Sequence, residues 1–213
     1  MRLVWNGRGK GSDVTGATQP AQFAQLEGYW QALRPADGAL PRRADFDPRG
    51  IADMLECCLL LERIASGQVR IRLAGMALCD LLGMDLRGMP LSALMVPEAR
   101  VALAAHLERV FAGPAIGRYR LEGERGFMRA PCMGDMLVLP LLGQSGRPDR
   151  ALACLVTDGR AGPAPRRFAL AMGGSRPIGG LVARPAPTPV PGMAEAPAPF
   201  AGPGRPHLRL VKG

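Results

Sequence analysis

The sequence CCLLLERIASGQVRIRLAG, residues 57–75, contains two apolar runs separated by a turn signal. The first run, Cys57–Ile64, is almost continuous, which is typical of a buried strand. Ser66-Gly67 is the turn signal, and in Val69–Leu73 the apolar residues alternate with arginines. The stretch therefore predicts an antiparallel hairpin whose second strand exposes one face to water.

Helical patterns precede this hairpin. Between Ala21 and Leu33 the apolar residues recur at steps of three and four, which indicates an amphipathic helix. A polar, turn-forming stretch begins at Pro35, and Asp47-Pro48 is placed to open a second short helix, Arg49–Leu55.

The pattern becomes helical again after the hairpin. Met76–Leu82 is expected to form a short helix that ends at Gly83, because glycine is favoured just past a helix C-terminus. The longest predicted helix is Pro97–Phe111, and Gly113-Pro114 ends it.

Three further strands are predicted after the long helix: Arg118–Glu122, Met136–Leu142 and Ala151–Val156. Pro140 cannot donate to a ladder, so we expect a bulge or a local break in pairing there. The order of elements fits an α+β fold, a five-stranded antiparallel sheet with helices on one face and an N-terminal amphipathic helix. Arg167–Met172 is a fragment that could add one more short strand.

Several short motifs resemble those of a stand-alone bacterial PAS subfamily, and the order of elements is similar to that of a PAS domain. The resemblance covers roughly residues 21–158, and its motifs are Tyr29-Trp30-x-x-Leu33-Arg34, Leu40-Pro41-x-Arg43-x-Asp45-x-Asp47-Pro48, Ile51, Arg72-Leu73-Ala74-Gly75 and Gly83-x-Asp85-Leu86-x-Gly88.

The resemblance implies a small pocket between sheet and helices that serves sensing or the control of a partner. It does not identify the ligand, so the cofactor is unknown. The second strand, the short helices and the long helix all turn apolar residues toward the same sheet. We expect these residues to bind the ligand: Leu73, Leu78, Leu82, Leu103, His106, Leu107 and Tyr119.

His106 has two interpretations. At about 100° per residue it lies about 60° from Leu103, at the border of the apolar stripe of the long helix. Haem-binding PAS proteins carry an axial histidine on this helix, so the resemblance implies haem ligation as one interpretation. The favoured one is a boundary histidine that bonds a backbone carbonyl or faces solvent.

Cys79 lies near the position of the flavin-reactive cysteine in light-sensing PAS domains, but the residues around it lack the Asn-Cys-Arg-type motif of those domains.

The five cysteines indicate no metal site. Zinc sites usually contain closely spaced ligand pairs, and the sequence has neither a C-x-x-C motif nor a histidine next to a cysteine. The favoured interpretation is reduced thiols that act as small apolar residues. They are Cys57, Cys58, Cys79, Cys132 and Cys154.

The net charge of +9 belongs mostly to the C-terminal part of the chain. Residues 159–213 carry eight basic side chains and one acidic one, whereas residues 48–158 carry 13 and 12. Arginine accounts for 25 of the 27 basic residues. A DNA-reading surface would concentrate charge on a folded element, so nucleic acid is not the favoured partner.

The chain divides into three predicted regions: a disordered leader at 1–19, a PAS-like domain with its flanking helix at 20–158, and a basic Pro/Ala/Gly-rich tail at 159–213. The tail ends in HLRLVK, residues 207–212, where Leu208 and Leu210 alternate with Arg209. Such a segment could add to a sheet edge of another protein as a docking peptide, or be a basic end without a partner.

Tyr29 and Trp30 of the first helix also have two interpretations. They could cap the sheet of their own chain, or form the seam of a homodimer. The sequence does not separate these alternatives.

No catalytic motif is present. A nucleophile elbow G-x-S-x-G is absent, and Gly7–Ser12 lacks the spacing and flanking elements of a phosphate loop. With no signal peptide and no membrane span, we expect a cytoplasmic, non-enzymatic sensor or adaptor. It would bind an apolar small molecule or none, and act by contact with a protein partner. The alternative is a basic accessory protein whose tail binds nucleic acid or an acidic membrane surface.

Overall fold

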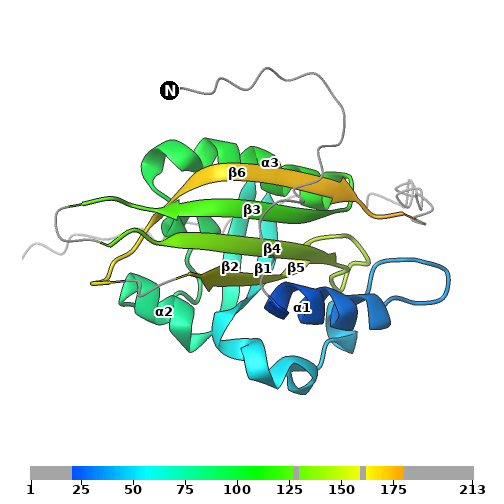
Figure 1. The fold of residues 1–213 in the computed structure, drawn as a ribbon. Coiled ribbons are helices and arrows are strands. Elements are labelled where there is room, and N and C mark those ends of the chain that lie inside the picture. Colours follow the sequence, from blue (N-terminus) through cyan, green and yellow to red (C-terminus); the bar gives the residue numbers. More distant parts are fainter. Residues whose placement is uncertain (1–20, 127–129, 159–161, 180–213) are drawn as a thin grey trace, which may run out of the picture. The chain divides into compact units, whose positions relative to one another are not determined.

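The computed structural model describes residues 21–126, 130–158 and 162–179. Six antiparallel strands form one sheet in the order β2-β1-β5-β4-β3-β6 (Figure 1). The strands are β1 Cys58–Ala65, β2 Gln68–Ala74, β3 Ala115–Gly123, β4 Met133–Leu141, β5 Arg150–Thr157 and β6 Phe168–Pro177. The helices are α1 Ala21–Ala32, α2 Met76–Leu82 and α3 Arg100–Ala112, with 3₁₀ turns η1 Arg43–Asp45, η2 Pro48–Cys57, η3 Leu91–Leu94 and η4 Pro97–Ala99.

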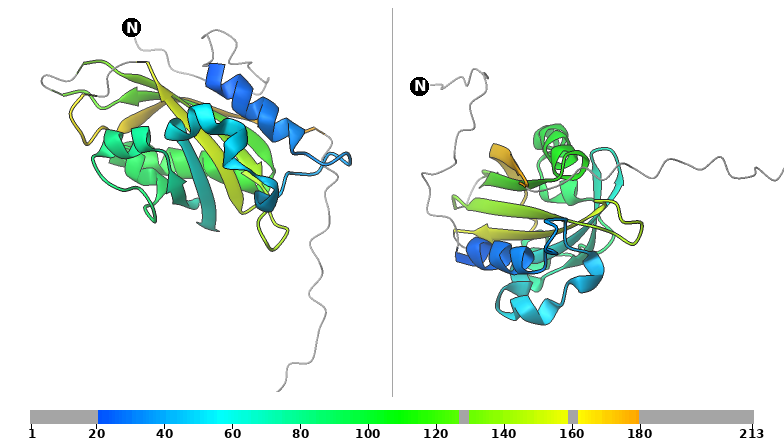
Figure 2. Two further views of the ribbon diagram at one scale, coloured as in Figure 1. Left: turned by 90° about the horizontal axis from the view of Figure 1, so that it is seen from below. Right: turned by 90° about the vertical axis from the view of Figure 1, so that its right-hand side faces the viewer.

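The sheet is buried on both faces, and this explains the continuous apolar runs in its central strands. Successive residues of a strand point to opposite faces. In β4, Met136 and Val138 join the core beneath α2, α3 and η3, whereas Leu137 and Leu139 join the core beneath α1 and η2. Figure 2 shows α3 on one side of the sheet and α1 with η2 on the other. The predicted α+β fold class is confirmed, but helical elements cover both faces of the sheet and not one face, because its central strands are apolar on both sides.

Strand β6 extends the sheet beyond the five predicted strands. It pairs with the whole of β3, from Ala115 opposite Pro177 to Gly123 opposite Phe168. Phe168 is completely buried in the core beneath α3. The fragment expected at Arg167–Met172 is therefore the first half of a longer strand, and the sheet continues past the predicted domain end at residue 158.

A β-bulge in β2 overturns one prediction about side-chain direction. Leu60 pairs with Leu73, but the next residue, Leu61, pairs with Ile71, so Arg72 is an extra residue. An extra residue reverses the alternation of faces beyond it. Leu73 is consequently 51% exposed, and its predicted position in the pocket is wrong.

Pro140 is accommodated without a bulge in the ladder to β5, where it pairs with Ala151 in unbroken register. On its other side, pairing of β4 with β3 ends at Val138. Pro140, which lacks an N–H, therefore lies beyond the end of the ladder between β4 and β3. The expected break in pairing is found on the β3 side, and the expected bulge is not found.

Helix α1 lies against its own sheet. Trp30 is fully buried, and its Nε1 donates a 2.9 Å hydrogen bond to the carbonyl oxygen of Pro140. The Tyr29 hydroxyl donates to the carbonyl of Asp47 at 2.9 Å and accepts from its N–H at 3.0 Å. Trp30 thus caps the sheet, whereas Tyr29 joins α1 to the start of η2. The homodimer through this helix stays a prediction. None of the helices in the described parts of the chain has the length and apolarity to cross a membrane.

Candidate functional site

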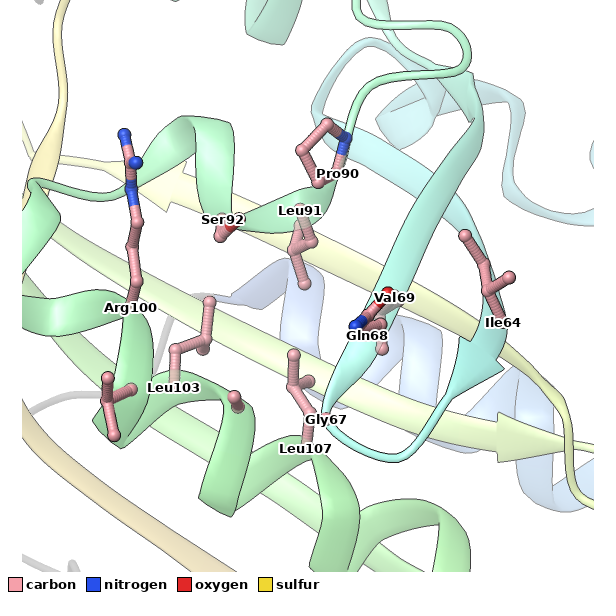
Figure 3. A pocket seen from close by; sticks show the side chains of 12 residues that line it. Ile64, Gly67, Gln68, Val69, Pro90, Leu91, Ser92, Arg100, Leu103 and Leu107 are labelled. Carbon is pink, nitrogen blue, oxygen red and sulfur yellow. The ribbon is translucent and has the colours of Figure 1, made fainter.

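A pocket of about 360 Å³ opens between the β1–β2 hairpin, η3 and the first half of α3 (Figure 3). Three segments form its wall. Turn residues of the hairpin form one side, the start of η3 the second, and the N-terminal turns of α3 the third. The lining residues are Ile64, Gly67, Gln68, Val69, Pro90, Leu91, Ser92, Arg100, Val101, Leu103, Ala104 and Leu107.

The pocket is mostly apolar, with a few polar side chains. Its most buried lining residues are Leu91, Leu103 and Leu107, all nearly inaccessible to water. Gln68, Ser92 and Arg100 are the polar members, and none of their side chains has a hydrogen bond or ion pair with another residue in the described parts of the chain. A largely apolar cavity with a few free polar groups, at the lower end of the usual ligand-pocket volume of about 300–1,000 Å³, suits a small organic molecule.

A carboxylate on α3 fixes the hairpin turn at one end of the pocket. The N–H of Gly67 donates to Oε2 of Glu108 at 2.9 Å, and Nη2 of Arg63 lies 2.5 Å from Oε1. The Gly67 hydrogen bond, followed by the charge of Arg63, lowers the pKa of Glu108 below its usual value. We call these three residues the Glu108 clamp. It joins the two walls of the pocket that belong to the hairpin and to α3.

The structure separates the predicted pocket residues other than His106 into three groups. Leu103 and Leu107 line the pocket, as Figure 3 shows. Leu78, Leu82 and Tyr119 are buried in the core on the same side of the sheet without lining this pocket. Leu73 faces outward because of the bulge described above. The hairpin turn and Pro90–Ser92 were not predicted as pocket residues, because apolar periodicity marks the faces of strands and helices and gives no signal for a turn.

His106 lies beside the pocket, between α3 and the far edge of the sheet. Its ring packs edge-on against Tyr119 with 5.6 Å between ring centroids, and a Cβ placed on Gly173 of β6 would lie 3.0 Å from it. Burial, followed by the charge of Arg109, lowers the pKa of His106. Its Nδ1 is buried and has no hydrogen-bond partner among the residues described. The histidine therefore fills space behind β6 and does not line the pocket.

The five cysteines form no disulfide. Cys79 and Cys132 belong to the core beneath α3, whereas Cys57, Cys58 and Cys154 come together on the other side of the sheet.

Comparison with protein families agrees with this architecture. A family model described as a PAS domain matches residues 18–156, which is more than half of the chain. The chain belongs to the PAS family. PAS domains act in general as sensor or interaction modules of signalling proteins, and this PAS protein has that general role. No match was found among the curated proteins.

Several predictions fall outside the residues that the structure describes. These are the leader at 1–19, most of the basic tail and the HLRLVK segment at 207–212. The alternative role in binding nucleic acid or an acidic membrane surface depends on that tail and therefore stays a prediction.

Proposed function

We propose that this PAS protein senses a small, largely apolar molecule in the pocket between the hairpin and α3, and transmits the bound state by contact with another protein. The observation that carries the proposal is the pocket's lining. Its apolar base, Leu91, Leu103 and Leu107, lies next to polar side chains that have no hydrogen bond or ion pair within the described parts of the chain.

Arg100 and Ser92 supply the polar end of the site. Arg100 lies at the edge of the pocket, at the first turn of α3, with Ser92 on the facing η3 segment (Figure 3). A guanidinium can bind both oxygens of a carboxylate or phosphate at once. We therefore expect a ligand with an apolar body and one anionic group.

The same arrangement provides a route for the signal. A bound molecule would touch both the hairpin and α3, which the Glu108 clamp already joins at the turn. Occupancy would shift the packing of α3 against the hairpin, and a partner that contacts α3 would sense the difference. The proposed role requires no catalysis by this chain.

The ligand can be sought with the intact protein. Native mass spectrometry identifies any retained molecule, and a panel of fatty acids and aromatic carboxylates is then titrated by NMR. We expect shifts confined to the hairpin, η3 and the start of α3, and weaker binding by Arg100→Ala of about tenfold, the equivalent of one charge-assisted hydrogen bond.

Arg87→Ala is the matched control, because Arg87 is exposed and does not line the pocket. Val101→Ser tests the apolar rim, since Val101 is 81% exposed and its replacement leaves the core intact. Ligand shifts located elsewhere, or equal affinities of Arg100→Ala and Arg87→Ala, would refute this assignment of the site.

A further inference from the structure

Three cysteines that are separate in the sequence meet at the joint between η2, β1 and β5. Cys57 is the last residue of η2, and Cys58 is the first of β1. Cys154 lies directly opposite Cys58 on the neighbouring strand β5. Because residues opposite each other in a sheet point to the same face, the register brings their thiols together.

The three sulfur atoms have nearly the spacing of a metal ligand set. They all lie within 4.8 Å of one another, and Sγ of Cys57 is 3.4 Å from Sγ of Cys154. A metal–sulfur distance of about 2.3 Å implies sulfur–sulfur distances of about 3.8–4.0 Å in tetrahedral or trigonal geometry. Side-chain rotations that move the sulfur atoms by about 1 Å or less would bring them to these distances.

The surroundings suit a thiolate–metal site. Cys58 and Cys154 are buried in the apolar core beneath α1, whereas Cys57 is half-buried and gives access from solvent. A metal ion that binds here would have to displace the protons of the thiols that it ligates.

We propose that Cys57, Cys58 and Cys154 together bind one thiophilic metal ion. Soft thiolate ligands favour Zn²⁺ and Cu⁺ among the common biological ions. Three thiolates leave one negative charge on a Zn²⁺ complex and two on a Cu⁺ complex, and the smaller charge costs less in an apolar core. We therefore expect Zn²⁺, with water from the Cys57 side as the fourth ligand. Each thiol that ionises when the metal binds releases its proton to solvent.

This site is independent of the pocket. The pocket belongs to the face of the sheet beneath α3, and the cysteine cluster belongs to the opposite face. Failure of either proposal leaves the other unaffected.

The test uses the untagged, fully reduced chain, titrated with Zn²⁺ in competition with a chromophoric chelator. A parallel anaerobic titration uses Cu⁺. We expect one ion per chain, a rise in the thermal midpoint on binding, and an affinity loss of at least about tenfold in Cys57→Ser. Cys57 is the first choice for substitution because it is only half-buried, so that its variant retains the fold.

Cys79→Ser is the matched control, since it removes one thiol outside the cluster. It should bind the metal like the unmodified chain. Co²⁺ substitution adds a second measurement, because thiolate-to-Co²⁺ charge-transfer absorption reports sulfur ligands directly and should weaken in Cys57→Ser alone. Binding of Cu⁺ in place of Zn²⁺ through the same cysteines would support the site. Equal metal affinity in the unmodified chain and in Cys57→Ser would overturn it.

Discussion

Gly75 lies between β2 and α2, at a point where the chain passes close to the backbone of η2. A Cβ at this position would lie 2.2 Å from the carbonyl oxygens of Leu55 and Glu56, so no other residue fits without moving the backbone. The Gly75 N–H also donates to the carbonyl of Cys58 at 2.9 Å. Its place in the Arg72-Leu73-Ala74-Gly75 motif therefore has a steric cause.

Gly75→Ala is expected to lower the free energy of unfolding by about 2–3 kcal/mol, as overpacking against fixed backbone does. Urea denaturation followed by circular dichroism measures the difference. Gly174→Ala is the control, because a Cβ at Gly174 would meet no atom within 4 Å. Equal denaturation midpoints for the two variants would contradict this prediction and show that the η2 backbone moves at little energetic cost to accommodate the methyl group.

The sequence identifies chemically interesting residues better than it identifies their neighbours. The sequence-based interpretation treats all five cysteines as reduced thiols that act as small apolar residues. Cys57 and Cys154, however, are in contact although they are separated by 97 positions. Their contact depends on the register of β1 against β5, which no local pattern encodes. The spacing of cysteines along the chain therefore does not reveal the cluster.

At the scale of elements, the Glu108 clamp joins α3 to the hairpin and gives the pocket a pH dependence. The folded-state pKa of Glu108 is lowered, so the carboxylate is stabilised by folding. Its contribution is complete above the ordinary glutamate pKa of about 4.3 and is lost as the pH falls through the lower folded-state value. Acidification should therefore loosen the hairpin turn.

Glu108→Gln tests this coupling, because it removes the charge and retains an oxygen acceptor. We expect the variant to be less stable than the unmodified chain by about 0.5–1 kcal/mol at pH 7, and the difference to shrink toward pH 3. Hydrogen exchange at the Gly67 amide should be faster in the variant at pH 7. Glu98→Gln serves as the control, since Glu98 has no ion pair in the described parts of the chain. A stability difference that does not vary with pH would contradict the proposed role of the charge.

Helices and strands could be predicted where the apolar periodicity was strong. The prediction failed where the backbone departs from regular periodicity. The β1–β2 hairpin, α2, α3 and the central strands were found within a few residues. The bulge at Arg72 was not, because Val69–Leu73 alternates perfectly and gives no sign of an extra residue. The second half of β6 contains Gly173-Gly174, and glycine pairs are poor strand formers, so the pattern predicted too short a strand.

At the scale of the whole molecule, the fold extends beyond the part that the family match covers. That match ends at residue 156, whereas the sheet continues through β6 to Pro177. Strand β6 covers the edge of β3, and the N–H of Val96 donates to the carbonyl of Phe168 at 2.9 Å. The sixth strand therefore joins the sheet to the segment that leads into α3, and with it to the wall of the pocket.

Truncation tests whether β6 is an integral part of the domain. A chain that ends at residue 158 loses β6 and leaves an apolar void where Phe168 packs, whereas a chain that ends at residue 179 keeps every element described. We expect the shorter chain to aggregate or to unfold at a clearly lower urea concentration, because it exposes the β3 edge and loses a large buried side chain. Phe168→Ala in the full chain separates the two causes: it keeps the strand and should cost about 3–5 kcal/mol. If the chain ending at 158 unfolded at the same urea concentration as the chain ending at 179, β6 would be an accessory strand and the five-stranded sheet the complete domain.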